Sequence, residues 1–240
     1  MSKIKVAIVG LGNCASALIQ GVHYYRNEKE DTRVPGLMHV RFGNYHVRDL
    51  EFVAAFEVNK DKIGKKINEA IWIDPNCTPK FSEVPETRGI VYPGPISDGV
   101  AAHMKNSFHC YDETQMETVD VAGVLKETKT DILVNFLPVG SENATRIYAE
   151  ACLEAGVAFA NGMPTFIVSD PTKKWPKRFE EKGIPCAGDD IKSQVGATIL
   201  HRVLAQLMLD RGIEVEKTYQ LNVGGNTDFE NMKYESRLKT

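Results

Sequence analysis

The chain has 240 residues, of which 42% are hydrophobic and 25% charged, and its formal net charge is −3 at pH 7. These values are ordinary for a globular protein, and the charge gives no reason to expect nucleic acid or an anionic membrane as a partner. No stretch approaches the roughly 20 apolar residues that span a bilayer, and the N-terminus passes directly into an apolar strand pattern. We therefore expect a cytoplasmic protein without a membrane partner.

Cysteine and histidine spacing argues against metal sites and disulfide frameworks. The five cysteines are widely spaced and include no C-x-x-C pair, so they are expected to be reduced. The six histidines show no H-x-x-x-H or H-E-x-x-H spacing, and we expect no metal site.

Apolar runs alternate with helical repeats through most of the chain. In chain order, we predict a strand at 4–9, a helix at 15–25, an inserted loop at 27–49, a strand at 52–58, a helix at 63–71, a short strand at 89–92, a strand at 131–137, a helix at 142–155, a short strand at 157–160, a helix disturbed by Pro176, a short strand at 184–187 and a long amphipathic helix that the run at 188–198 opens. This alternation predicts an α/β fold with a doubly wound, Rossmann-type parallel sheet over residues 1–212.

The pattern changes after Gly212. Apolar and polar residues then alternate with period two from 215 to 223, which is typical of an antiparallel strand with one wet face. One such strand cannot bury its own apolar face. We therefore expect residues 213–240 to begin a second, α+β domain for catalysis or oligomerisation, which either another subunit or further chain completes.

A glycine-rich turn follows the first predicted strand. Gly10-Leu11-Gly12-Asn13-Cys14-Ala15 fits G-x-G-x-x-G/A, and the next residue is Ser16. In this pattern Gly10 makes the tight turn, Gly12 lets a pyrophosphate approach the backbone and Ala15 allows close packing of helix and strand. The helix N-terminus supplies free N–H groups to the phosphates. Because the motif lies between a strand and a helix, it predicts a dinucleotide site, with a plain tight turn as the alternative.

Glu57 ends the second main strand, where a carboxylate accepts hydrogen bonds from ribose hydroxyls. The inserted loop explains why it lies farther along the chain than usual. A carboxylate here repels a 2′-phosphate, which favours NAD over NADP. Asp61 and Asn59 are rival candidates for this contact. Alternatively, Glu57 is only an exposed residue at the end of the strand and has no role in binding.

Two further turns follow predicted strands, at 137–141 and 161–164. Pro138, Ser141 and Asn161 could lie beside a nicotinamide there, or the turns could serve only the shape of the chain. In the later Gly-Gly-Asn turn, Asn226 and Asp228 could bind a cation or a phosphate-bearing substrate, or act only as turn residues.

Lys192 lies in or beside the first turn of the long helix, where the partial positive charge disfavours a cation. Such a site can lower the pKa of a lysine and prepare it for proton transfer. The alternative is a surface lysine that extends into solvent or pairs with Asp189 or Asp190.

Several of these motifs together resemble the bacterial and archaeal type of myo-inositol-1-phosphate synthase. The resemblance covers nearly the whole chain in the right order, and it is carried by residues 6–16, 34–42, 137–141, 188–198 and 221–229. It implies an NAD-dependent isomerase in inositol and phospholipid biosynthesis, acting on a sugar phosphate and assembled as a homotetramer. Within the matching motifs it implies catalysis by Lys192 and cofactor contacts by Asp189 and Asp190.

The resemblance also implies a reaction. Carbon 5 of glucose 6-phosphate is oxidised, the carbon 6 enolate attacks the carbon 1 aldehyde, and the product is reduced again by the same cofactor. The family's chain continues beyond the equivalent of residue 240 through an assembly sheet and further lysines. A chain that lacked these is expected to bind NAD without turnover. The alternatives are an ordinary NAD-dependent dehydrogenase of a small polar substrate and a nucleotide-binding module without chemistry.

Overall fold

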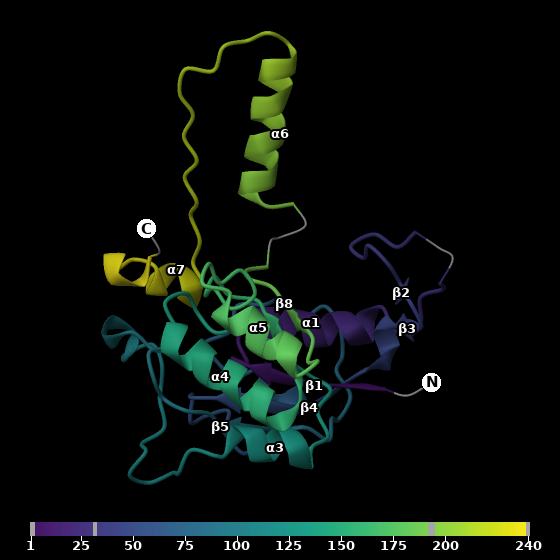
Figure 1. Ribbon diagram of the computed structural model, residues 1–240, viewed down its shortest axis with the longest axis vertical. Coiled ribbons are helices and arrows are strands. Elements are labelled where there is room, and N and C mark those ends of the chain that lie inside the picture. The colour runs from purple at the N-terminus through teal and green to yellow at the C-terminus, as the bar shows by residue number, and fades with distance from the viewer. Residues whose placement is uncertain (1–2, 31–32, 192–194, 239–240) are drawn as a thin grey trace.

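Six parallel strands form one sheet in the order β5-β4-β1-β6-β7-β8 (Figure 1). The structure is a computed structural model that describes residues 3–30, 33–191 and 195–238. The strands are β1 (Ile4–Val9), β4 (Leu50–Glu57), β5 (Ile90–Pro93), β6 (Ile132–Asn135), β7 (Ala158–Asn161) and β8 (Cys186–Ala187). This order confirms the doubly wound fold, and it reverses direction between β1 and β6, which is where ligands bind in such sheets.

The central strand β1 is hydrogen-bonded on both edges, with Val6 beside Phe52 of β4 and Ile132 of β6. Residues 6–9 are almost fully buried. A strand covered on both faces needs apolar side chains at successive positions, and this is why the run at 4–9 does not alternate.

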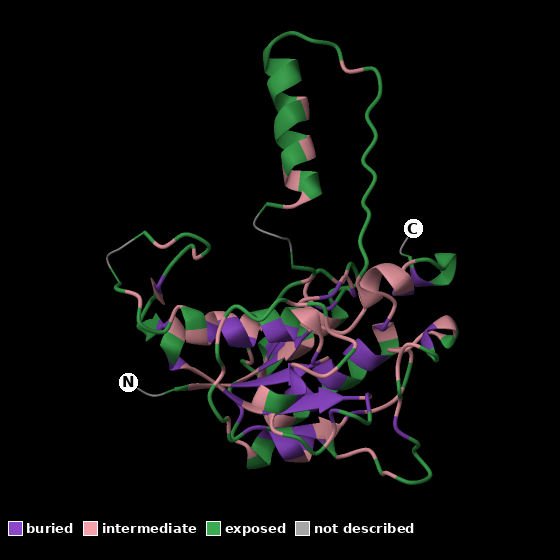
Figure 2. Cartoon of the chain, turned by 180° about the vertical axis from the view of Figure 1, so that it is seen from behind, coloured by how far each residue is buried: buried purple, intermediate pink, exposed green. Residues whose placement is uncertain are grey.

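Helices cover both faces of the sheet. On one face, α3 (Val121–Glu127), α4 (Glu142–Ala155) and α5 (Lys174–Glu181) enclose a core around Phe56, Leu133 and Phe159. On the other face, α1 (Asn13–Tyr24) and α2 (Ile67–Ala70) enclose Ile8 and Ile19. Figure 2 shows the buried residues concentrated in the strands and in the helix faces that lie against them.

Several predicted elements are confirmed and others differ. Helix α4 ends at Gly156, which has φ +73° as a left-handed cap requires. The helix expected at 63–71 is only the single turn α2, because Gly64 has φ +79° and interrupts it. Pro176 does not disturb α5, since it lies in the first turn, where no intrahelical N–H bond is lost.

The inserted loop at 27–49 contains a small antiparallel pair, β2 (Arg41–Phe42) and β3 (Tyr45–His46), followed by the 3-10 turn η1 (Val47–Asp49). A second 3-10 turn, η2 (Ala102–Met104), and the helix α3 lie in a part of the chain for which no element was predicted.

Helix α6 (Ala197–Asp210) and the extended segment 213–225 project away from the sheet (Figure 1). Their large apolar side chains are exposed, for example Leu207 at 54% and Val223 at 95%. The described residues of 213–225 form no strand, because no neighbouring strand offers hydrogen bonds there. The chain then returns to the sheet as α7 (Thr227–Asn231) and the 3-10 turn η3 (Glu235–Arg237). The division into two domains stays a prediction.

In the described ranges, no helix has both the length and the apolar character that crossing a membrane requires.

Candidate functional site: a cavity at the carboxyl ends of the strands

The glycine turn after β1 forms one end of a cavity of about 330 Å³. Gly10 has φ +80°, and a Cβ at this position would lie 2.8 Å from the carbonyl oxygen of Phe136. A Cβ on Gly12 would meet no atom within 4 Å. Helix α1 starts after Gly12 without a side-chain cap and without an acidic residue in its first turn. Its first N–H groups are therefore available to an anion, as the sequence predicted for this turn.

Two buried charged side chains fix the peptide groups of this turn. Glu57 Oε2 accepts from the Leu11 N–H at 2.9 Å, and Lys62 Nζ donates to the Leu11 carbonyl at 2.7 Å. Lys62 is only 1% exposed, and its desolvation lowers the pKa of its ammonium group. The middle residue of the glycine turn is thus held on both sides, an arrangement that the sequence analysis did not identify.

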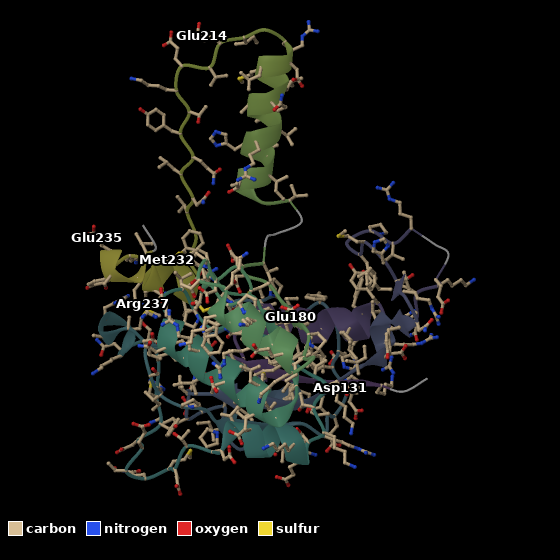
Figure 3. All side chains as sticks on the ribbon, in the orientation of Figure 1. Asp131, Glu180, Glu214, Met232, Glu235 and Arg237 are labelled. Atoms are coloured by element: carbon tan, nitrogen blue, oxygen red, sulfur yellow. The ribbon has the colours of Figure 1, made fainter. Side chains whose placement is uncertain are left out.

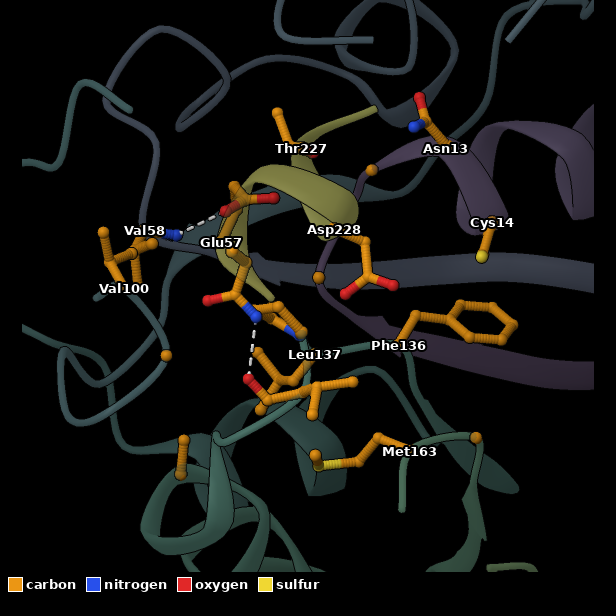
Figure 4. Close-up of a pocket in the computed structure, with 18 of the residues that line it drawn as sticks. Asn13, Cys14, Glu57, Val58, Val100, Phe136, Leu137, Met163, Thr227 and Asp228 are labelled. Carbon is orange, nitrogen blue, oxygen red and sulfur yellow. Dashed lines mark hydrogen bonds between the residues drawn. The ribbon is translucent and has the colours of Figure 1, made fainter. Parts of the chain in front are cut away.

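Glu57 lines the cavity and also accepts hydrogen bonds from the backbone around it. Besides Leu11, its carboxylate accepts from the N–H groups of Val58 at 2.8 Å and Asn59 at 3.3 Å (Figure 4). A carboxylate has about four acceptor positions, so one remains for a ligand hydroxyl. Among the rivals, Asn59 is buried and bonded to the Asp74 carbonyl, while Asp61 pairs with His109 at the surface. Neither rival lines the cavity.

Asn13 lines the cavity beside Gly12 and is hydrogen-bonded to the loop at 74–78. Its Oδ1 accepts from the Cys77 N–H at 2.9 Å, and its carbonyl accepts from Thr78 Oγ1 at 3.1 Å. These contacts fix the start of α1 without occupying its free N–H groups.

The side of the cavity at β6 and β7 rests on a buried amide network. Asn135 Nδ2 donates to Asn161 Oδ1 at 3.0 Å, and Asn161 Nδ2 donates to the Thr165 carbonyl at 2.7 Å and to Asp189 Oδ1 at 2.8 Å. The hydroxyl of Ser141 is buried and donates to the Pro138 carbonyl at 2.6 Å. Asn161 and Ser141 therefore shape the turns, and of the residues predicted there only Pro138 lines the cavity.

The adjacent acidic residues Asp189 and Asp190 point to different places. The Asp189 carboxylate accepts from the N–H groups of Ile167, Val168 and Ser169 as well as from the Ser169 hydroxyl. The structure thus gives Asp189 a role in ordering that loop, away from the cavity wall, whereas Asp190 lines the cavity.

Helix α7 covers the cavity from above the glycine turn (Figure 4). The Asn226 side chain caps it by accepting from the Phe229 N–H at 3.0 Å. Asp228 points its carboxylate into the cavity, and its Oδ1 has no hydrogen-bond partner in the described residues. Desolvation raises the pKa of Asp228. It also raises the pKa of the nearby Cys14 thiol, with a smaller contribution from the Asp228 charge.

The structure brings most of the predicted site residues together. The predicted residues that line the cavity are Gly10, Gly12, Asn13, Cys14, Glu57, Pro138, Asp190, Asn226 and Asp228. Those that lie behind the wall are Ala15, Ser16, Ser141, Asn161 and Asp189. Lys192 lies outside the described residues.

One end of the cavity is lined by apolar side chains that were not predicted from the sequence. Val58, Val100, Met104 and Phe108 lie there, three of them in or near η2. Their stretch is irregular and shows no helical or strand period, so no sequence signal identified it. The apolar side chains at this end of the cavity, beside Glu57, suit the ring of a nucleobase.

The described cavity wall carries carboxylates and no cationic side chain. Across the described residues, no group of three or more histidine, cysteine or acidic side chains could hold a metal ion.

Comparison with known proteins shows which family the chain resembles. The pattern of the family described as Myo-inositol-1-phosphate synthase matches residues 196–240. The chain is 56% identical, over 99% of its length, to an inositol-3-phosphate synthase of Mycolicibacterium smegmatis. It is 53% identical, over 100% of its length, to one of Corynebacterium glutamicum. In both cases it spans 64% of the relative's length.

Solved structures agree with this fold. The crystal structure of Ari2 matches with a TM-score of 0.82 and 33% identity over 97% of this chain and 67% of that one. A myo-inositol-1-phosphate synthase-related protein from Thermotoga maritima matches with a TM-score of 0.69 and 25% identity, over 95% of this chain and 64% of that one.

Proposed function

Because the chain belongs to the inositol-3-phosphate synthase family, we propose that its cavity binds NAD and forms part of the active site of such a synthase. The observation that carries the proposal is the uncapped N-terminus of α1 behind Gly10 and Gly12, which opens into a cavity shared with Glu57 and α7. The proposed reaction converts glucose 6-phosphate to myo-inositol phosphate by internal oxidation, aldol closure and reduction. When bound, NAD accepts a hydride in the first step and returns it in the last.

The residues of the chain fit this cofactor. Gly10 admits the close approach of β6, and Gly12 leaves room for a pyrophosphate against the free N–H groups of α1. The remaining acceptor position of Glu57 suits a ribose hydroxyl, and the charge of Glu57 disfavours a 2′-phosphate. The apolar end of the cavity at Val58, Val100 and Met104 suits the adenine ring.

Proton transfer and phosphate recognition need cationic groups that the described wall lacks. We assign proton transfer at carbon 5 to Lys192, because it lies in the motif 188–198 that resembles the family's pattern. Asn226 and Asp228, which line the cavity, are assigned to hydroxyls of the substrate or to a cation that bridges it. Recognition of the substrate phosphate and assembly into a homotetramer are assigned to the full-length enzyme, since the chain spans 64% of its curated relatives.

Titration of the chain with NAD and with NADP tests the cofactor part, and saturable binding that prefers NAD is expected. Absence of NAD binding would contradict the proposal. For the reaction, the chain completed to the length of its relatives is incubated with glucose 6-phosphate and NAD. Inositol phosphate without net NADH is expected, whereas stoichiometric NADH would favour an ordinary dehydrogenase. Lys192→Ala in the same protein should retain NAD binding and lose turnover; unchanged turnover would remove Lys192 from the mechanism.

A further inference from the structure

Arg237 of η3 is an arginine buried beside the cavity, with only 9% of its surface exposed. Its Nη1 donates to the carbonyls of Asp98 at 2.8 Å and Gly140 at 3.1 Å, and its Nη2 reaches the Gly99 carbonyl at 3.5 Å. Its Nε donates to Asn231 Oδ1 at 3.0 Å. One guanidinium group therefore joins three segments that lie up to 139 positions apart in the chain.

The surroundings are built to accept this side chain. Gly140 has φ +86°, and a Cβ there would lie 2.8 Å from Arg237 Nε. The Asp98 carboxylate does not pair directly with the guanidinium, because it caps α4 by accepting from the N–H groups of Asn143 and Ala144. A buried charge held mainly by carbonyls is an expensive way to stabilise a fold. Its geometric benefit is that a planar donor fixes several backbone groups at once.

The segments that Arg237 joins are also walls of the cavity. Gly99, Val139 and Asn231 all line it, and Asn231 Nδ2 donates to the Val139 carbonyl at 2.9 Å. Figure 3 shows Met232 at the end of α7 and Arg237, from η3, close to it.

A second set of contacts attaches α7 to η2. His103 lies 3.1 Å from the Glu230 carbonyl, Ser107 donates to Glu230 Oε1 at 2.9 Å, and the His103 ring stacks on Tyr234. These contacts fix the middle of the segment but not its approach to the turn at 138–140. Asn231 of α7 bonds directly to Val139 of that turn, but among the hydrogen bonds of the described residues only those of Arg237 reach the turn and residues 98–99 together.

We propose that Arg237 is a positioning residue that assembles the cavity, holding α7 and its residues Asn226 and Asp228 over the glycine turn. The proposal uses the geometry of the wall, and it rests on the proposed function only for the choice of NAD as the probe. Arg237 touches no reacting group in this arrangement; it acts through Asn231 and the backbone of the two turns.

Arg237→Met and Arg237→Lys test this inference, with Arg178→Met as the control, since Arg178 pairs with Glu150 at the surface. Amide hydrogen exchange reports the docking of α7 without any ligand. In Arg237→Met, exchange of residues 227–232 and 139–141 should accelerate at least about tenfold, the change expected from losing one charge-assisted hydrogen bond. NAD affinity should fall about tenfold for the same reason, while the melting temperature stays within the shift of the control. Arg237→Lys should recover part of both losses.

Unchanged exchange in Arg237→Met would overturn the inference, as would faster exchange with unchanged NAD affinity. If the unmutated chain does not bind NAD, the proposed cofactor is refuted, and hydrogen exchange alone decides the role of Arg237. If Arg237→Met does not fold, Asn231→Ala takes its place, because it removes an acceptor of Arg237 and the link to Val139. Unchanged exchange and affinity in Asn231→Ala would then refute the inference.

Discussion

Replacing Glu57 with glutamine removes one charge and one acceptor oxygen while keeping the size of the side chain. In the structure both carboxylate oxygens accept, one from Leu11 and the other from Val58 and Asn59. A glutamine must turn its NH2 group toward one of these donors. The less costly orientation keeps the bonds to Val58 and Asn59 and leaves the Leu11 N–H facing another donor.

The magnitude follows from the burial of this group. Leu11 is fully buried and Glu57 is 6% exposed, so water does not replace the lost acceptor. A hydrogen bond to a charged group contributes about 1.5–3 kcal/mol, and a buried donor without a partner costs about 1–3 kcal/mol. Because these two terms overlap, we expect Glu57→Gln to lower the free energy of unfolding by about 2–3 kcal/mol. For a chain of this size that corresponds to a fall in melting temperature of roughly 5–10 °C.

Urea denaturation and thermal melting measure this change, and NAD titration measures its effect on the glycine turn. Glu154→Gln is the matched control, because Glu154 pairs with Lys126 at the surface with 65% of its side chain exposed. The control should change stability by less than about 0.5 kcal/mol. NAD affinity should fall in Glu57→Gln and not in the control. If the two variants are equally stable, Glu57 does not anchor the turn and this reasoning is refuted.

Three further predictions concern the same cavity. Gly10→Ala should lower stability by about 1–2 kcal/mol or more, because φ +80° and the Phe136 carbonyl oppose a Cβ. Gly12→Ala should lower the melting temperature less, because it only replaces the N-cap of α1 with a poorer one, and it should weaken NAD binding. Equal melting temperatures for the two variants would contradict this contrast. Asp228→Asn should raise the melting temperature at pH 7, because a raised carboxyl pKa in the folded state destabilises the fold once the carboxyl is ionised in the unfolded chain. This gain should shrink as the pH falls toward about 4 and vanish near about pH 3, where the carboxyl is protonated in both states. A pH-independent difference would refute the cause. Asp189→Ala leaves the N–H donors of the 167–169 loop without their acceptor. Proteolysis within that loop should therefore accelerate, while NAD affinity changes little. A selective loss of NAD affinity would instead assign Asp189 to the cofactor site.

Elements whose structure depends on local sequence patterns could be predicted from the sequence. The apolar run at 4–9, the glycine turn after it and the helix ended by Gly156 each carry their signal within a few residues. Strand order then follows from the connection rules of parallel sheets, and so the predicted strand ends met at one edge.

Contacts that a side chain makes with residues far away in the sequence could not be predicted. Lys62 meets Leu11 across 51 positions, and Arg237 meets Asp98 across 139. Lysine and arginine are usually exposed, and no local pattern around Lys62 or Arg237 predicted that these side chains are buried. The bonds of the Asp189 carboxylate to the backbone at 167–169 were not predicted for a related reason, since these N–H groups have no side-chain signature.

The charged groups around the cavity share one physical property, which links these results. Desolvation lowers the pKa of Lys62 and Arg237 and raises that of Asp228, so for each of them burial opposes the charged form. Lys62 and Arg237 recover that cost through backbone carbonyls, whereas Asp228 Oδ1 has no partner in the described residues. Perturbed groups of this kind gather at functional sites, where ligands supply the missing partners. A ligand that donates to Asp228 should therefore bind more tightly to the unmutated chain than to the more stable Asp228→Asn variant.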